Sequence, residues 1–172
     1  MWLKLLAFFR ELEPNRHFLK LWASQALSLT AFNMVNFTLL LRVYDLTDSA
    51  VMVSLFVLSF GLPSLLFGAV AGVFADRWNR RSVVIGTNLL RTLIVLAYLP
   101  ALDNLAASFA ATFAIATITQ FFTPAEGALI PELVERKRLV AANAIFMTTL
   151  FGTFVLGYGV AGPLAAIGGD QL

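Results

Sequence analysis

Long runs of apolar residues, separated by short polar breaks, make up most of this chain. A helix needs roughly 20 apolar residues to cross the about 30 Å hydrocarbon core of a bilayer, because its backbone polar groups must be satisfied within the segment. Five segments meet this requirement: Phe18 to Val43, Ala50 to Ala75, Ser82 to Leu102, Leu105 to Leu129, and Leu139 to Ile167. The pattern predicts an all-α membrane protein with about five transmembrane helices.

The composition agrees with this prediction. Of the 172 residues, 59% are hydrophobic and 13% are charged, whereas a soluble domain carries about 25% charged residues. One soluble core of this size could not hide so many apolar side chains without exposing large patches. The small net charge of +2, with its basic residues in short clusters, argues against a nucleic-acid partner. The lipid bilayer is the expected partner.

The basic residues predict how the chain is oriented, because Lys and Arg accumulate in cytoplasmic loops. Only Arg42 falls on the opposite side, and Arg91 lies within a span. We therefore expect a multi-pass protein of the plasma (cytoplasmic) membrane, with its N-terminus inside and Leu172 outside. The other ten basic residues are expected on the cytoplasmic side: Lys4, Arg10, Arg16, Lys20, Arg77, Arg80, Arg81, Arg136, Lys137 and Arg138.

Residues 1–17 form a separate amphipathic segment before residues 18–172. A helix here would place Lys4 and Glu11 on one face and apolar side chains on the other, so it could lie flat on the inner leaflet. A signal peptide is the alternative, but Arg10 interrupts the apolar run and no small-residue cleavage site follows. We expect an interfacial segment.

The break between the second and third spans contains the most specific motif, which reads Gly72-Val-Phe-Ala-Asp76-Arg77-Trp-Asn79-Arg80-Arg81. It resembles the signature loop of the major facilitator superfamily, in which Asp-Arg follows Gly and precedes a turn residue and a basic pair. Asn79 stands where that family usually has Gly, and Asn tolerates the left-handed backbone better than most residues.

Two further segments extend the resemblance through nearly the whole chain. They run from Leu21 to Ser28 and from Pro124 to Ala144, and they are similar to the branch that contains enterobactin exporters and macrolide efflux permeases. The resemblance implies two six-helix halves that rock around a central cavity. This chain would then be a partial N-terminal bundle, helices one to five, with the C-terminal part of the transporter missing.

The resemblance also implies that the signature loop joins the two halves on the cytoplasmic side and favours the outward-facing state. Gly72 would let another helix approach closely, and Asp76 could accept hydrogen bonds at a helix N-terminus or pair with an arginine. The candidate gating loop is thus Gly72, Asp76, Arg77, Arg80 and Arg81. The alternative is that its basic residues only fix the topology.

Gly159, Gly162 and Pro163 resemble part of the antiporter motif, which bends helix five. A proline inside a helix removes a backbone donor and clashes with the preceding turn, so we expect a kink. Ala166 and Ile167 replace the glycines that follow in that motif. Ordinary close packing therefore competes with an antiport function for these residues.

Arg91 lies deep within the third span, where a charge costs at least about 2.5 kcal/mol. Side chains lean toward the N-terminus of their helix, so Arg91 and Glu126, on antiparallel spans, can converge. We expect an intramembrane ion pair between them. Snorkelling of Arg91 to the interface is the alternative.

The polar residues of the first span fall within an arc of about 140° at 100° per residue. By resemblance this helix lines the transport cavity, so they are candidate substrate contacts. Hydrogen bonding between helices is an equal alternative. The residues are Gln25, Ser28, Asn33 and Asn36.

The only histidine is His17, there is no cysteine, and the acidic residues cluster in or near loops. No hydrolytic triad or metal cluster is evident, so we expect neither an enzyme nor a cofactor. The expected function is that of an ion-coupled, secondary-active efflux carrier (permease) for small amphipathic compounds such as drugs or siderophores, working by alternating access. The alternative is a membrane assembly or regulatory subunit that transports nothing.

The topology can be tested with single cysteines, since the chain has none of its own. Cysteines at Asn79 and Lys137 should be protected from impermeant reagents in intact cells, whereas those at Thr47 and Asn104 should react, because of the basic bias. Labelling of position 79 from outside would contradict the expected orientation.

Overall fold

The computed structural model describes residues 16–168, apart from the side chains of Asp76 and of residues 164–168. The elements of this part confirm the all-α membrane fold, because its five long helices all have the length and composition to cross a membrane. They are α2 (Arg16–Thr47), α3 (Ala50–Arg77), α4 (Arg80–Tyr98), α5 (Leu105–Leu133) and α6 (Leu139–Gly168), with short 3-10 helices η1 (Leu99–Ala101) and η2 (Arg136–Arg138).

The first of these helices begins slightly earlier than the sequence pattern suggests. Because α2 starts at Arg16, the last two residues of the expected interfacial segment belong to the first spanning helix. Residues 1–15, which hold the rest of that segment, lie outside the described part.

Polar side chains cap the start of three helices. Ser49, Asn79 and Asn104 precede α3, α4 and α5, and each side-chain oxygen accepts from the amide three residues on, at 3.4, 3.1 and 3.1 Å. These bonds satisfy amides that the first helical turn leaves without a partner. Asn79 has φ −64° and ψ 109°, so its backbone is extended and not left-handed. Its polar side chain serves as an N-cap.

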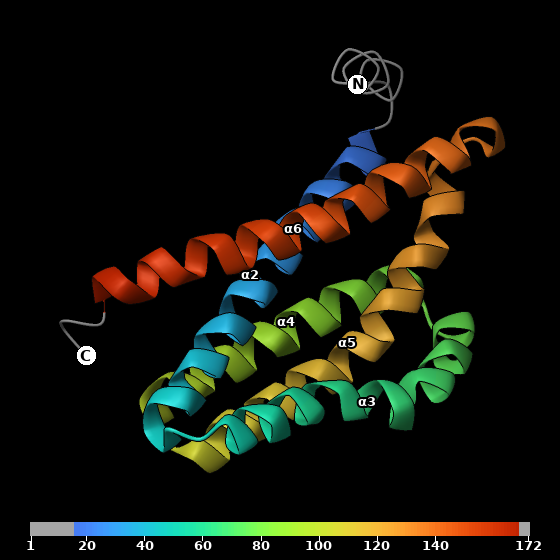
Figure 1. Ribbon diagram of the computed structural model, residues 1–172. Helices are drawn as coiled ribbons and strands as arrows, with labels where there is room; N and C mark the ends of the chain where they lie inside the picture. Colours follow the sequence, from blue (N-terminus) through green and yellow to red (C-terminus); the bar gives the residue numbers. More distant parts are fainter. Residues whose placement is uncertain (1–15, 169–172) are drawn as a thin grey trace.

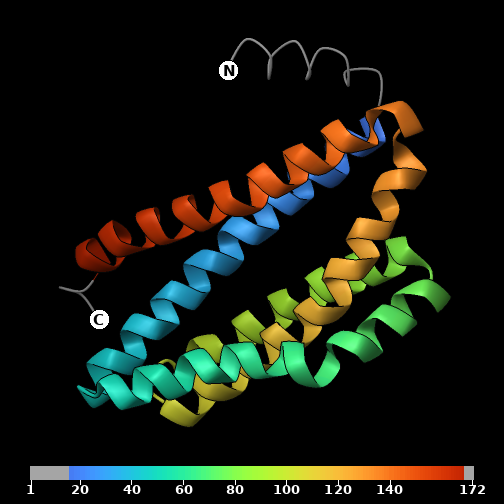
Figure 2. The same ribbon diagram turned by 45° about the vertical axis from the view of Figure 1, so that its right-hand side comes forward.

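The helices pack in two groups. α5 packs along both α3 and α4, and α6 packs along α2; Figure 1 shows α6 crossing α2 above the other three helices. α2 and α6 start at the same end of the molecule (Figure 2). α2 also contacts α3 and α5, and it therefore joins the two groups.

Prolines occur inside three of the helices without ending them. Pro63 lies in α3, Pro124 and Pro131 in α5, and Pro163 in α6. Figure 2 shows α3 changing direction part-way along its length, as expected where proline removes a backbone bond and clashes with the preceding turn. α6 continues past Pro163 to Gly168.

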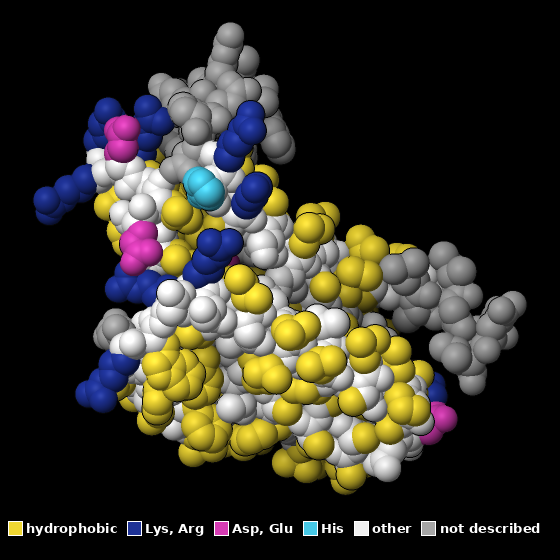
Figure 3. All heavy atoms as spheres, turned by 180° about the vertical axis from the view of Figure 1, so that it is seen from behind, with side chains coloured by type: hydrophobic (Ala, Val, Ile, Leu, Met, Phe, Trp, Pro, Cys, Tyr) yellow, Lys and Arg dark blue, Asp and Glu magenta, His cyan; other side chains and the backbone are white. Residues whose placement is uncertain are grey.

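Most of the apolar surface faces outward. Leu65 and Val140 are each 83% exposed, which would favour aggregation in water but suits contact with lipid. Figure 3 shows broad hydrophobic surfaces, with Lys and Arg side chains gathered mainly toward one side. The distribution matches that of a protein whose main solvent is a bilayer.

α6 crosses α2 in a tight contact at Gly157. A Cβ built on Gly157 would lie 2.4 Å from Asn33 Cβ and 3.2 Å from both Met34 N and Thr30 O. Small residues permit such backbone contact between membrane helices. Gly157 therefore sets the separation of α2 and α6.

Gly157→Ala should separate this helix pair and destabilise the protein by about 1–3 kcal/mol, because the added methyl overpacks the contact. The measurement is the free energy of unfolding in detergent. Gly159→Ala is the matched control, since a Cβ at Gly159 meets nothing within 4 Å. Each substitution replaces Gly by Ala and so raises the helix propensity of α6 by the same amount. Equal changes in the free energy of unfolding would therefore show that Gly157 does not set the separation of α2 and α6.

Candidate functional site

A buried arginine lies where α2, α4 and α5 meet. Arg91 of α4 is 6% exposed, and its guanidinium carbon lies 4.4 Å from the ring centroid of Phe122 on α5 and 5.7 Å from that of Phe32 on α2. A cation near an aromatic face is attracted by the ring quadrupole, and more strongly when both are desolvated. Side chains of two other helices thus hold this charge inside the bundle.

Asn88 connects the arginine to the first span. Its Oδ1 atom accepts a hydrogen bond of 2.8 Å from Ser28 Oγ and lies 3.5 Å from Arg91 Nη1. Residues three apart on a helix share a face, which is why Asn88 and Arg91 point toward the same neighbours. Ser28 of the polar stripe therefore bonds to another helix in this structure.

Glu126 is buried on α5, also at 6% exposure. Among the described side chains, Glu126 and Arg91 form no direct salt bridge. Glu126 lies one turn after Phe122, which explains why it faces the arginine. The structure brings both expected partners to one site, and their energetic coupling remains a prediction.

Three polar atoms of this site have no hydrogen-bond partner among the described protein atoms: Arg91 Nε, Arg91 Nη2 and Glu126 Oε1. Gln25 Oε1, one turn before Ser28 on α2, also has none. Of these four atoms, two are donors and two are acceptors, and they come from three helices. Buried polar atoms are normally satisfied by protein, ordered water or ligand. We call this set, Gln25, Ser28, Asn88, Arg91 and Glu126, the polar centre.

The remaining residues of the polar stripe make other contacts. Asn36 is 8% exposed and donates a 2.9 Å bond to the carbonyl of Phe32 in its own helix. Asn33 packs against Gly157 of α6. Both contacts are those of helix packing, and a role in substrate binding remains a prediction for all four stripe residues.

The expected gating loop divides into residues with and without partners. Arg80 pairs with Glu132 and donates a 3.2 Å bond to the carbonyl of Ala128, both on α5. Arg77 and Arg81 are exposed, with no ion pair in the described part. A Cβ at Gly72 would meet nothing within 4 Å. The side chain of Asp76 lies outside the described residues.

Two other ion pairs lie near the helix ends. Arg42 pairs with Asp103, at the end opposite to the basic clusters. Lys137 Nζ lies 2.8 Å from a carboxylate oxygen of Glu135. That hydrogen bond and the nearby positive charges hold the pKa of Glu135 below its usual value. Both pairs are solvent-accessible and are expected to contribute little stability.

The residues expected to bend helix five are spread along one end of α6. A Cβ at Gly159 would meet nothing within 4 Å, and one at Gly162 would lie 3.7 Å from Phe37 Cε1, an ordinary contact. Pro163 is exposed. The tight crossing involves Gly157, which the motif did not include.

The sequence matches the family model described as Major Facilitator Superfamily over residues 21–170. The chain belongs to the major facilitator superfamily. It is 27% identical over 158 residues to the macrolide efflux protein A of Streptococcus pyogenes, which covers 87% of this chain and 38% of that protein. It is also 27% identical over 160 residues to the uncharacterized MFS-type transporter YjbB of Bacillus subtilis, with the same coverage.

The chain thus spans about two fifths of the length of these relatives. No solved structure gives a significant match. The likeness to macrolide efflux proteins is confirmed, and the likeness to enterobactin exporters remains a prediction. Membership of this superfamily identifies a transporter-type chain and not an enzyme.

In this superfamily member, the sequence motifs did not single out Asn88, Phe32 or Phe122. Helix spacing could have identified two of them. Asn88 lies three residues before Arg91, and Phe122 lies four residues before Glu126, so each shares a helix face with a charged residue that the sequence had indicated. Phe32 carried no such signal. Only the packing of α2 against α4 brings its ring to the guanidinium.

Arg91→Ala and Glu126→Ala should prove non-additive in a double-mutant cycle. Removing either charge leaves the other buried without compensation, so we expect a coupling energy of about 0.5–3 kcal/mol. The free energies of unfolding of the four proteins in detergent provide the measurement. Strict additivity would mean that the two charges do not support one another. Glu132→Ala with Arg91→Ala is the control pair, because Glu132 bonds to Arg80 instead.

Proposed function

We propose that the chain forms part of a secondary-active efflux carrier for small amphipathic compounds, working by alternating access. The observation that carries the proposal is a polar centre held inside apolar helices of a major facilitator superfamily protein. Ionisable residues within membrane spans usually face a bundle interior and mark transport pathways or proton relays. This centre has that character.

The carrier is proposed to be ion-coupled through the polar centre. Glu126 is the only buried acidic side chain among those described, and it lies near a permanent positive charge. Binding of a proton to Glu126 would leave Arg91 without its countercharge and change the electrostatic balance between α4 and α5. Such a change could favour one arrangement of the helices over the other.

The substrate is proposed to be amphipathic because the polar centre is lined by aromatic rings. Phe32 and Phe122 offer apolar contact beside the donors of Arg91. Few polar groups in an apolar site are typical of small-molecule binding. One relative is named a macrolide efflux protein, which makes a macrolide the first compound to test; drugs of other classes and siderophores come next.

The setting of the carrier is also a proposal. We place it in the plasma membrane with a cytoplasmic N-terminus, residues 1–17 on the inner leaflet, and residues 18–172 as a partial N-terminal bundle. Further helices, such as those that complete the longer relatives, are proposed to supply the other wall of the cavity. Asp76 is proposed to act in the gate between the two walls.

Asp76→Asn should lower transport more than abundance, because it removes a charge from the proposed gate while preserving the size of the side chain. The measurement is macrolide efflux from vesicles by the chain joined to the remaining helices of a relative. We expect a loss on the order of fivefold or more at equal membrane abundance. Asp45→Asn, at the exposed far end of α2, is the control and should transport normally.

Three results would count against the proposal. Normal transport by Asp76→Asn would exclude Asp76 as the gate. Transport without any ion gradient would exclude secondary coupling. Absence of efflux for every amphipathic compound tested, by a correctly inserted protein, would favour the non-transporting subunit.

A further inference from the structure

One edge of the Arg91 guanidinium has no protein partner in the described part of the chain. Its Nε and Nη2 atoms form no hydrogen bond there, although the side chain is only 6% exposed. Nε–H and one Nη2–H point in the same direction, so they form a fork that matches the two oxygens of a carboxylate. The rings of Phe32 and Phe122 attract the charge, but they provide no lone-pair acceptor for these donors.

The other terminal nitrogen of Arg91 has a weak contact with a neutral group. Nη1 lies 3.5 Å from Asn88 Oδ1, and that oxygen already accepts a 2.8 Å bond from Ser28. Glu126 brings an opposite charge to the site without a direct salt bridge. Buried charges are normally paired and hydrogen-bonded. The Nε and Nη2 donors therefore lack both a hydrogen-bond acceptor and a directly bonded countercharge.

A small ligand can reach these donors between α2 and α4. Ser28, Phe32 and Asn88, the neighbours of the arginine on these helices, are each half-buried. α2 and α4 meet mainly through these side chains, because the close packing of α2 is with α6. All of these groups come from this chain, so the site does not depend on further helices.

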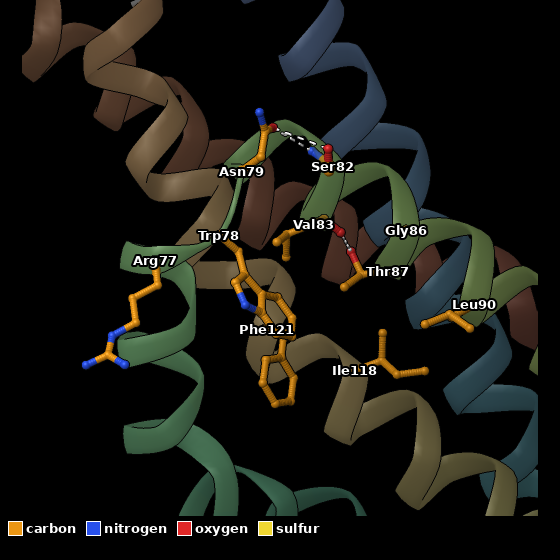
Figure 4. A pocket seen from close by; sticks show the side chains of 10 residues that line it. All are labelled: Arg77, Trp78, Asn79, Ser82, Val83, Gly86, Thr87, Leu90, Ile118 and Phe121. Atoms are coloured by element: carbon orange, nitrogen blue, oxygen red, sulfur yellow. Dashed lines mark hydrogen bonds between the residues drawn. The ribbon is translucent and has the colours of Figure 1, made fainter.

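A pocket of about 730 Å³ lies on another face of α4. Figure 4 shows Arg77 directed away from it. Two of its polar side chains are engaged within the chain, since Asn79 accepts a 3.1 Å bond from the Ser82 amide and Thr87 donates a 2.7 Å bond to a carbonyl of its own helix. The side chains described there offer no buried, unpartnered donor, whereas Arg91 offers two.

We propose that the polar centre binds the carboxylate of an amphipathic organic acid, with its oxygens on Nε and Nη2 of Arg91 and its apolar part against Phe32 and Phe122. As the anion binds, Glu126 takes up one proton from the bulk solution and holds it on its carboxylate. The buried charges remain balanced, because the charge of Arg91 is opposed by Glu126 before binding and by the ligand afterwards. This substrate class rests on the proposed carrier function.

The proton is assigned to Glu126 because Arg91 is the charged group that faces it from the neighbouring helices. The charged side chains of α2 lie within about two turns of its ends, and the others described on α3 and α4 flank the loop between these helices. The sequence of α6 contains no charged residue. A ligand carboxylate beside an ionised Glu126 would set two negative charges against one positive charge, so one carboxylate must be protonated.

The test compares the binding of 2-naphthoate and 2-naphthamide to the purified chain in a neutral detergent, by equilibrium dialysis with protein-free micelles as the blank. The two compounds share one ring system and differ in charge. We expect naphthoate to bind at least about tenfold more tightly, the effect of one charge-assisted pair. Its affinity should fall as the pH rises, by up to about tenfold per unit while naphthoate stays ionised, because one proton enters with each anion.

Two substitutions and one control locate the site. Arg91→Lys should abolish the preference for naphthoate, since lysine keeps the charge but lacks the fork. Glu126→Gln, which resembles the protonated acid, should keep the preference and lose the pH dependence. Arg136→Lys is the matched control, because Arg136 is exposed in the loop before α6, and it should change neither property. Circular dichroism verifies the helical content of each variant.

Equal affinities for the two compounds, no saturable binding of naphthoate, or a preference that survives Arg91→Lys would overturn the proposal. So would a naphthoate affinity that does not change with pH, or a pH dependence that survives Glu126→Gln. The unsubstituted chain and Glu126→Gln decide the question even if Arg91→Lys does not fold.

Macrolide efflux, measured separately, distinguishes this proposal from the carrier function on which it rests. Efflux without naphthoate binding would support the carrier and show that the acid site is wrong. Naphthoate binding without efflux of any compound would contradict the carrier and support the acid site alone.

Discussion

The cost of placing a guanidinium within a membrane-spanning helix is the constraint on which the interior of this bundle depends. Arg91 cannot lose its charge as a lysine can, and lipid offers it no hydrogen-bond acceptors. The bundle meets this cost with the rings of Phe32 and Phe122 and the carbonyl oxygen of Asn88. Because these groups belong to α2, α4 and α5, one side chain fixes how three helices face each other.

This arrangement also defines where the two packed groups meet. α2 packs along α6 through the close contact at Gly157, whereas its opposite contacts reach the α3, α4 and α5 group through Ser28 and Phe32. Helix association in a bilayer relies on close packing and hydrogen bonds, since lipid removes most of the hydrophobic driving force. A tight glycine crossing on one side and a polar contact on the other are therefore the two kinds of interaction available to α2.

The sequence predicted the five spans to within a few residues, because the thickness of a bilayer sets a simple length rule. It also singled out Arg91 and Glu126, since buried charges are rare and their lean along a helix can be calculated. It did not identify Gly157, because a close approach depends on which residue of α2 lies opposite. Asn79 stands where the family usually has Gly, and the structure shows that its side-chain oxygen caps α4, a role that glycine cannot fill.

The three described arginines of the loop between α3 and α4 illustrate how one motif can serve several purposes. A basic cluster biases topology whatever its side chains contact, so topology alone does not require any of them to occupy a defined position. Arg80 nevertheless contacts α5 at Ala128 and Glu132, which ties the start of α4 to the end of α5. Arg77, the last residue of α3, is exposed. The same loop therefore combines a structural contact with an exposed cation.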